Sequence, residues 1–488
     1  MQLSRNIIVL LISLLCWGCT KVSEVDGGIS ASSSSGSVEG VTEWMDDLLS
    51  DYYLYNDEYN TLSRDLTLSY DTFLGTTLGS MTTNVLDNKN GSVFTWIERS
   101  ASSKATTKIS TTKVLELSYG LASVSAVAYG SSQYILGVNA VIVDSPLYNA
   151  GVRRGDYIVS VEGATFTSSS VSGYMQLLLN PTSEATLSLG VLSSNRVKTI
   201  SVSSQYIYCS PILHYDIYNE TVGYLSYLNF DMAYDDELLE VLAYFKSKGV
   251  TDLILDMRLN TGGHTISANK LSTSIIGSDS YGRVFANYQY NPTLSAKLSS
   301  SSKVDYFYTT LSSYYLNLDR LYCLVSGKTA SASEMVINSL RGLDKEVVLI
   351  GAQTVGKNVA MAIYEDSFDG WDYTFYPVMM VVSNAKGFSG YDEGFAPDYE
   401  VDDWDSSWNY ADFSQSEVMV KTALNLISPS SKAGEAVGES TNAMVNPLQS
   451  YLQSQSPESM ADNLVLTQEY ELSTPRSQRG GNITPLEF

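Results

Sequence analysis

The chain has 488 residues, more than one folding unit usually holds, so we expect two or three domains. Its 53 acidic residues outnumber 29 basic ones and give a formal net charge of −24, which excludes the basic surface of a nucleic-acid-binding protein. With only four cysteines the fold does not depend on a dense disulfide framework, and a hydrophobic content of 44% is ample for ordinary cores.

The first residues have the pattern of an export signal. The apolar run at residues 7–15 is shorter than the roughly 20 residues that a membrane-spanning helix needs. It ends in Leu-Cys-Trp-Gly-Cys, which resembles a bacterial lipobox cut before Cys19, so that a diacylglyceryl thioether replaces the thiol. We therefore expect a signal peptide at 1–18, a lipidated Cys19 with a flexible linker over 19–40, and a location in the bacterial cell envelope. An ordinary signal peptide with an incidental cysteine is the alternative.

An amphipathic helix is expected directly after the linker. Trp44, Leu48 and Tyr52 recur at a spacing of four within residues 43–59, which places them on one face of a helix. The pattern predicts a small, mainly helical N-terminal region over residues 41–112. The apolar face indicates a core and carries no chemistry.

Residues 113–205 have the alternation of a small β-rich module. Short β-branched runs separated by turns predict strands, and one apolar run predicts a helix. The expected strands are 134–143, 157–161, 185–191 and 197–203, and the expected helix is 171–179. The pattern therefore predicts a compact domain of its own.

The middle of this module resembles the PDZ domains of bacterial proteases. It carries Ser-Pro, Ala-Gly and Gly-Asp-x-Ile strings between residues 145 and 158. PDZ domains bind an extended peptide by adding it to a sheet edge and holding its terminal carboxylate in backbone amides. The resemblance implies a carboxylate-binding loop at 134–137, with Ile135, Leu136 and Gly137 as peptide-binding residues. A rigid spacer that binds nothing is the alternative.

Buried strands and amphipathic helices alternate over residues 206–428, as an α/β domain requires. The expected strands are 222–230, 251–258 and 321–325, and the expected helices are 235–248 and 331–343. Residues 429–488 are rich in Ser, Gln, Asn and Gly and lack a sustained period. We expect this low-complexity tail to be loosely ordered and to carry little function.

Two strings in the α/β domain carry reactive side chains. Small residues lead a buried strand into a helix at Ser331, which places a hydroxyl at a helix N-terminus, and a second strand ends in a glycine turn and Lys357. A lysine can act as a base when its pKa falls from about 10.4 to near 7 or 8, a shift of roughly 4 kcal/mol that burial supplies. A helix cap alone would explain the serine, but not the glycine turn and the lysine. We therefore take Ser331 as the nucleophile and Lys357 as the general base.

These strings resemble the C-terminal processing peptidases, the S41 family that includes the tail-specific proteases. In that family the nucleophile is the first serine of Ala-Ser-Ala-Ser-Glu, here Ser331, and the base is the lysine of Thr-x-Gly-Lys, here Lys357. An Asp-x-Arg-x-Asn-x-Gly-Gly string at 256–263 and a Gly-x-x-Pro-Asp string at 394–398 complete the pattern. The resemblance implies a multidomain α/β fold, with an S41 peptidase core preceded by the PDZ domain, and a Ser-Lys serine endopeptidase acting on polypeptides.

The resemblance also implies an oxyanion hole. One donor is a glycine amide of the Gly-Gly turn, which corresponds to Gly262, with Gly263 as the alternative, and the other is the amide of Ala332. Each donor of this kind typically contributes about 3 to 4 kcal/mol to transition-state stabilisation. The family pattern implies no metal and no organic cofactor, and it leaves the oligomeric state open.

One position departs from the family pattern. Many relatives carry a glutamine four residues after the lysine, where it orients the amine, but this chain has Met361 there. The interval from Ser331 to Lys357 is also about one residue longer than usual. The third member of a catalytic triad is therefore not identified.

Other functions fit these strings less well. A phosphate-binding loop fails because Tyr322 stands where its first glycine must be, and a penicillin-recognising enzyme fails because its strings would occur in the wrong order. A Ser-His-Asp hydrolase would need His214 or His264 as its base. The main alternative from another class is a catalytically silent, peptide-binding envelope lipoprotein, with Met361 marking the loss of turnover. Such a scaffold has no reason to keep the nucleophile, the base and both glycines together.

Overall fold

The computed structural model describes residues 40–89, 91–101, 112–129, 133–193, 196–403 and 412–428, together with a strand at 468–473. The expected signal peptide 1–18, the lipidated Cys19 and almost all of the linker lie outside these residues. No helix in the described ranges is long and apolar enough to cross a membrane.

The N-terminal unit combines helices with strands from two distant parts of the chain. Its elements are α1 (Val41–Tyr52), α2 (Asn56–Tyr59), α3 (Tyr70–Gly79), β1 (Asn88–Lys89), β2 (Ser92–Val93) and β3 (Trp96–Ala101). β3 pairs with β21 (Trp371–Tyr376), which pairs with β20 (Tyr364–Phe368). Met45 and Phe73 from the helices share one core with Met361 and Phe375. The region expected to be helical and separate is therefore built together with residues from the α/β part of the chain.

The PDZ-like module is an antiparallel sheet with short helices. Its elements are β5 (Leu121–Tyr129), β6 (Gln133–Val141), α4 (Pro146–Asn149), β7 (Tyr157–Val161), β8 (Phe166–Thr167), α5 (Val171–Leu179), β9 (Thr186–Ser193) and β10 (Arg196–Ser203). The strand order is β10-β9-β7-β6-β5, with β8 beside β6. A two-stranded ribbon of β4 (Leu115–Ser118) and β11 (Gln205–Tyr208) joins the start of the module to its end.

The expected carboxylate-binding loop is not a loop. Ile135, Leu136 and Gly137 lie inside β6, where they pair with β5 on one side, and Leu136 and Gly137 also pair with β7 on the other. Their backbone groups are committed to the sheet, so a peptide cannot add there. The sequence prediction was wrong because an apolar run that ends in glycine fits a paired central strand as well as it fits a loop.

The structure describes one segment of the tail. β24 (Gln468–Ser473) pairs antiparallel with β5 and forms the edge of the PDZ-like sheet. These six residues of the tail, which was expected to be loosely ordered and to carry little function, extend a sheet that begins more than 300 residues earlier in the sequence.

The α/β core is a six-stranded sheet. Its strands are β12 (Ile212–Tyr218), β13 (Val222–Tyr227), β14 (Asp252–Asp256), β17 (Arg320–Val325), β18 (Glu346–Gly351) and β23 (Tyr399–Glu400), in the order β12-β13-β14-β17-β18-β23. β12 is antiparallel to β13, and the other neighbours are parallel. The sheet therefore has one edge at which the carboxyl ends of β14, β17 and β18 meet, the usual position of a site in such a sheet.

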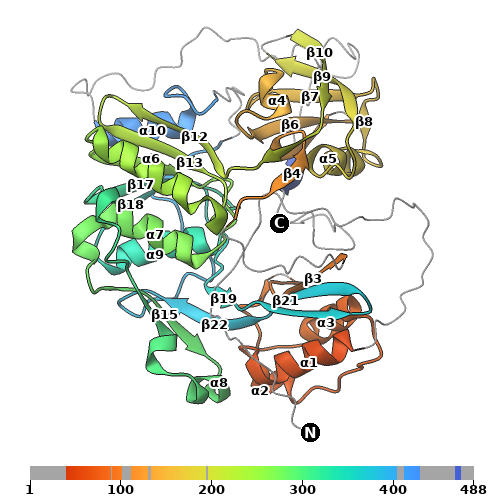
Figure 1. Cartoon of the computed structure of the whole chain (residues 1–488), viewed down its shortest axis with the longest axis vertical. Coiled ribbons are helices and arrows are strands. Elements are labelled where there is room, and N and C mark those ends of the chain that lie inside the picture. The colour runs from red at the N-terminus through yellow and green to blue at the C-terminus, as the bar shows by residue number, and fades with distance from the viewer. Residues whose placement is uncertain are drawn as a thin grey trace.

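Helices and a neighbouring module cover the two faces of this sheet. The apolar side chains of α6 (Asp235–Ser247), α7 (Thr265–Ile276) and α9 (Ala332–Gly342) pack on one face, and those of α10 (Val418–Ile427) pack on the other. Ala140 and Ile142 of the PDZ-like module join the second face. The N-terminal unit in red and the PDZ-like module in orange and yellow lie on separate sides of the green core (Figure 1).

The remaining elements form a small sheet and several connections. The strands β15 (Val284–Tyr290), β16 (Val304–Tyr306), β19 (Val359–Met361) and β22 (Val378–Ser383) are ordered β16-β15-β22-β19. The short helices are α8 (Pro292–Lys297) and the 3₁₀ turns η1 (Met232–Tyr234), η2 (Gly277–Ser280), η3 (Ser300–Lys303) and η4 (Ser312–Tyr314). β19 begins two residues after Lys357, so this sheet fixes the chain that follows the expected base.

Candidate active site

Ser331 stands on a sharp turn between β17 and α9. Its backbone has φ 56° and ψ −115°, a conformation that a residue with a side chain rarely adopts and that active sites often hold under strain. The turn is tied to the chain after β14, because Thr329 Oγ1 donates to the Met257 carbonyl at 2.9 Å and Ser333 Oγ donates to the Asn260 carbonyl at 3.1 Å. Ser331 is 8% exposed, so its hydroxyl is held in a fixed and largely enclosed position.

The Gly-Gly turn lies directly against this serine. A Cβ placed on Gly262 would come within 2.9 Å of the Ser331 Cβ and within 3.0 Å of the Ala330 carbonyl oxygen. The Gly262 N–H donates to Asn260 Oδ1 at 2.9 Å, so it is already engaged. The N–H groups of Gly263 and Ala332 find no acceptor within the described part of the chain. The turn and the start of α9 therefore present two unengaged amides near Ser331.

Lys357 lies in a buried position between two units of the fold. It is 4% exposed, and its Nζ lies 4.0 Å from Met361 Sδ and 4.5 Å from the centroid of the Phe94 ring. Phe94 belongs to the N-terminal unit, where Asp87 fixes the next residue by accepting from the Thr95 N–H at 2.8 Å. Burial raises the pKa of Asp87. The hydrogen bonds from Tyr53 and Thr95 and the positive charge of Lys357 act in the opposite direction and lower it. The lysine is thus positioned by contacts that the local sequence does not contain.

Glu334 joins the serine to the lysine. Its Oε2 accepts from the Ser331 N–H at 2.9 Å and from the Lys357 N–H at 2.8 Å. Its Oε1 accepts from the Gly356 N–H at 2.7 Å and from Thr354 Oγ1 at 2.6 Å. The side chain is fully buried, and burial raises its pKa, while the four hydrogen bonds act in the opposite direction because they favour the carboxylate. One oxygen atom thus holds the main chains of Ser331 and Lys357 next to each other.

The Gly-x-x-Pro-Asp string supports the lysine turn. Phe395 N–H donates to Thr354 Oγ1 at 2.7 Å, and Thr354 N–H donates to the Phe395 carbonyl at 3.1 Å. A Cβ on Gly394 would come within 2.0 Å of the Thr354 carbonyl oxygen, so no larger residue fits there. All four sequence strings therefore meet in one place.

Comparison with known proteins agrees with this arrangement. Residues 221–401 match the sequence model of Peptidase family S41. The chain carries an S41 domain. A curated relative, the chloroplastic carboxyl-terminal-processing peptidase 1 of Arabidopsis thaliana, is 26% identical over 244 residues, which are 49% of this chain and 47% of the relative. The chain thus matches about half the length of that relative.

A solved structure extends the likeness beyond the S41 domain. It is the crystal structure of a Bacteroides fragilis chain assigned to the S41 proteases, with a TM-score of 0.64 and 25% sequence identity. The match covers 79% of this chain and 97% of that chain. The order of units around the S41 domain is therefore also found in another protein.

The two histidines occupy places that do not suit a base for Ser331. His214 lies in β12 and stacks on Phe413 at 5.9 Å between ring centroids, on the face that α10 covers. His264 follows the Gly-Gly turn, but its Nδ1 lies 2.9 Å from the Phe230 carbonyl oxygen, and burial lowers its pKa to about 4. A base with that pKa takes a proton poorly near neutrality, so the geometry does not favour the histidine alternative.

The Asp-x-Arg-x-Asn part of the S41 pattern has a structural role. Arg258 is fully buried and binds Asp256, Glu417 and Asp403, the last at 2.7 Å. Asn260 Nδ2 donates to the Tyr227 carbonyl at 2.9 Å while its Oδ1 accepts from Gly262. These side chains hold the turn that carries the glycines.

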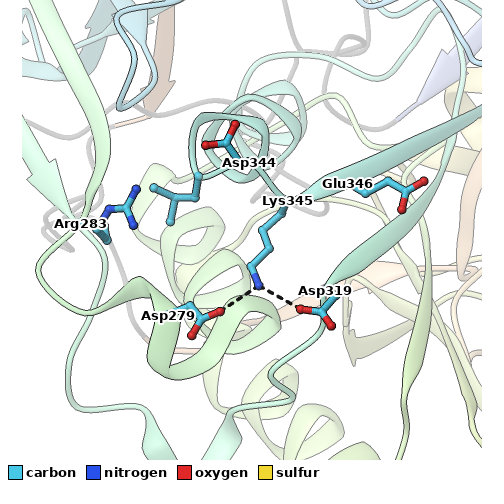
Figure 2. Close-up of a pocket in the computed structure, with 7 residues that line it drawn as sticks. Asp279, Arg283, Asp319, Asp344, Lys345 and Glu346 are labelled. Atoms are coloured by element: carbon cyan, nitrogen blue, oxygen red, sulfur yellow. Dashed lines mark hydrogen bonds and ion pairs between the residues drawn. The ribbon is translucent and has the colours of Figure 1, made fainter.

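A separate surface cavity of about 480 Å³ lies at the other end of the core strands, at the starts of β17 and β18 (Figure 2). It is lined by Asp279, Arg283, Asp319, Leu343, Asp344, Lys345 and Glu346. Lys345 Nζ binds Asp279 at 3.0 Å and Asp319 at 3.5 Å, so its charge is already neutralised. This cavity contains no residue of the S41 strings and is not part of the site.

Sequence reasoning missed two residues of this site. Glu334 had a usable signal, because a serine followed three residues later by glutamate is a capping-box pattern. Phe94 had none, since only the folded chain brings it to Lys357.

Proposed function

We propose that this protein is a serine endopeptidase in which Ser331 is the nucleophile and Lys357 is the general base. The observation that carries the proposal is the fully buried carboxylate of Glu334, one oxygen of which binds the main-chain N–H of both residues. The strained backbone of Ser331 and the S41 match support the same assignment. Family membership alone would not exclude an inactive scaffold.

The residues suggest the following steps. Lys357 Nζ, as the free amine, takes the proton of Ser331 Oγ while this oxygen attacks the peptide carbonyl carbon. The oxyanion lies against the N–H groups of Gly263 and Ala332, since the Gly262 N–H is engaged by Asn260. The C–N bond breaks as the lysine returns the proton to the leaving amine, which leaves an ester on Ser331. Water then attacks this ester with the lysine again accepting a proton, and the carboxylic acid product and the free hydroxyl are formed.

We further propose that the PDZ-like module binds the substrate peptide at the edge of β5. Gly120 stands directly before this strand with φ +91°, and a Cβ there would come within 1.9 Å of Ser145 Oγ. This turn, rather than residues 134–137, is the position where a peptide terminus would lie, and the Gly120 N–H fixes the turn by donating to Ser118 Oγ at 2.9 Å. The bound peptide would be an additional strand, with backbone hydrogen bonds as its main interactions.

The envelope location belongs to the same proposal. The lipobox-like string predicts that Cys19 carries the lipid and that the folded part is tethered to a bacterial membrane. Fractionation of cells that express the whole chain should find it with the membranes, and Cys19→Ala should move it to the soluble fraction. An unchanged distribution would refute the lipid anchor.

The test of the peptidase proposal is cleavage of casein by the form that starts at residue 20. Ser331→Ala and Lys357→Ala should each reduce the rate at least about a thousandfold, as removal of one member of a catalytic unit does. His264→Asn is the matched control and should keep most of the activity. If only the histidine variant is inactive, the base is wrongly assigned. If the unmodified form cleaves neither casein nor other unfolded proteins, the protein is the silent peptide-binding lipoprotein.

A further inference from the structure

The edge of the PDZ-like sheet is already occupied. In the strand order β10-β9-β7-β6-β5-β24, β5 has β6 on one side and the tail strand β24 on the other. Val124, Ser125 and Ala126 of β5 are fully buried. Without β24, every second backbone N–H and C=O of β5 would face outward with no partner from the sheet.

The register gives β24 the direction of a bound peptide. Gln468 lies opposite Val127 and Ser473 lies opposite Ser123, so the tail runs antiparallel to β5 and towards the turn at Gly120. A peptide whose terminus is held at that turn would have to run the same way. The chain continues for 15 residues after Ser473, so the tail lies there as an internal segment and not through its terminal carboxylate.

We propose that residues 468–473 are an intramolecular ligand of the PDZ-like module, which occupies the edge where a substrate peptide would add and competes with it. This inference rests on the proposed peptide-binding function of the β5 edge. A covalently attached segment acts at an effective concentration on the order of millimolar, so it displaces peptides of ordinary micromolar affinity. Substrates would then gain access in proportion to the time that the tail is released.

The first test measures the edge itself by hydrogen exchange. Three forms that start at residue 20 are compared, ending at residues 488, 473 and 466. Removal of residues 467–488 should make those amides of residues 123–127 that face β24 exchange at least about tenfold faster, because their ladder of hydrogen bonds is lost. Removal of 474–488 alone is the matched control and should leave the exchange of β5 unchanged. Equal exchange in all three forms would contradict the proposal.

The second test measures competition. The probe is a fluorescein-labelled synthetic peptide of residues 464–475, added to the three forms with Ser331→Ala so that nothing is cleaved. The form ending at 466 should bind the probe at least about tenfold more tightly than the other two. Equal affinity for all forms, or no binding by any of them, would overturn the proposal.

A variant of the full-length form distinguishes loss of the tail strand from a folding defect caused by truncation. Tyr470→Pro with Glu471→Pro removes the backbone N–H of two successive residues. Because the N–H groups of alternate residues point towards β5, one of the two lost groups is a donor to β5. This double variant should bind the probe like the form ending at 466. The matched control carries Asn482→Pro with Ile483→Pro, outside the strand, and should bind like the unmodified chain.

The two proposals fail in different ways. Probe binding does not need catalysis, so tight binding without casein cleavage would refute the peptidase and keep the tail as a ligand. Casein cleavage with the same KM in all three forms, together with equal probe binding, would refute the tail as a competitor and keep the peptidase. If both are correct, removal of residues 467–488 should lower KM several-fold and leave kcat nearly unchanged.

Discussion

Glu334 gives the site its geometry at the scale of single residues. The proposed catalytic pair is separated in the sequence by a helix and a strand, so some group must set the spacing of its two main chains, and one fully buried carboxylate binds both of them. The same side chain fixes the turn before the lysine through Thr354 and Gly356. Glu334 is thus a positioning residue, since it touches neither the hydroxyl nor the amine by any of these bonds.

Glu334→Gln tests this role. A glutamine has one accepting oxygen and two N–H donors, so donors that now meet a carboxylate oxygen would face the amide nitrogen. We expect kcat to fall about 10- to 100-fold with KM changed less than about threefold, and the free energy of unfolding to fall by about 2 kcal/mol. Steady-state kinetics and urea unfolding measure both. Glu346→Gln at the exposed start of β18 is the control, and a large rise in KM alone would contradict the positioning role.

Met361 is the second residue with a sharp test. Its sulfur is a weak acceptor 4.0 Å from Lys357 Nζ, at the position where many relatives carry an amide. Met361→Gln should hold the amine through a stronger acceptor and keep or raise kcat/KM several-fold. Met361→Leu keeps the volume, lacks the sulfur and should change kcat/KM by less than about threefold. Loss of activity in the glutamine variant would show that the pocket requires an apolar side chain.

The sequence singles out the two proposed catalytic residues but not the side chains around them. Ser331 and Lys357 stand in short strings whose chemistry can be recognised locally, and the structure brings their main chains together through Glu334. Phe94 packs against the lysine from the N-terminal unit, and a contact between positions so far apart in the chain leaves no trace in local periodicity.

At the scale of elements, the turn between β14 and α7 lies directly against Ser331. Gly262 has φ +114° and lies against both the serine and the start of α9. A glycine is therefore required for two reasons, the positive φ and the lack of space for a side chain. The strand before it and the helix after it leave no room for the turn to move away, because Asn260 is hydrogen-bonded on both of its polar atoms.

Gly262→Ala is therefore expected to damage the fold and the activity together. The new Cβ would overlap the Ser331 Cβ at a positive φ, which should lower the free energy of unfolding by about 2 to 3 kcal/mol and reduce kcat at least about a hundredfold. Gly282→Ala is a matched control with φ +65° and open space around its Cβ position. It should cost only about 1 kcal/mol, measured by urea unfolding, with activity unchanged. Similar losses in both variants would mean that backbone strain alone, and not the contact with Ser331, is responsible.

The sequence predicts a helix or strand correctly where the apolar pattern lies within one continuous segment. The predicted strand 157–161 and helix 171–179 have the bounds of β7 and α5. The predicted helix 43–59 is instead broken at Tyr53, because this buried side chain leaves the helix to bind Asp87 through its hydroxyl at 2.6 Å. β24 was missed because a six-residue strand in a polar tail is stabilised by the edge it joins and not by its own composition.

At the scale of the whole molecule, Asp403 links two units. Its Oδ1 lies 2.6 Å from Arg154 of the PDZ-like module and 2.7 Å from Arg258, one of the side chains that hold the turn at Gly262 and Gly263. Burial opposes the charge on this carboxyl, but the two guanidinium groups outweigh it and hold its pKa at about 2. No sequence pattern could predict this junction, since its three members come from three distant segments.

Asp403→Asn should show a pH-dependent loss of stability. The pKa of Asp403 in the folded chain, about 2, is below the value of about 3.9 for an unfolded aspartate, so the carboxylate stabilises the fold above pH 4 and this contribution disappears as the pH falls towards 2. We expect the variant to lower the free energy of unfolding by roughly 2 kcal/mol at pH 7 and by about half as much near pH 3. Urea unfolding at both pH values measures the difference, with Asp319→Asn as a fully exposed control. An equal loss at both pH values would mean that packing, and not the charge between the two arginines, holds the units together.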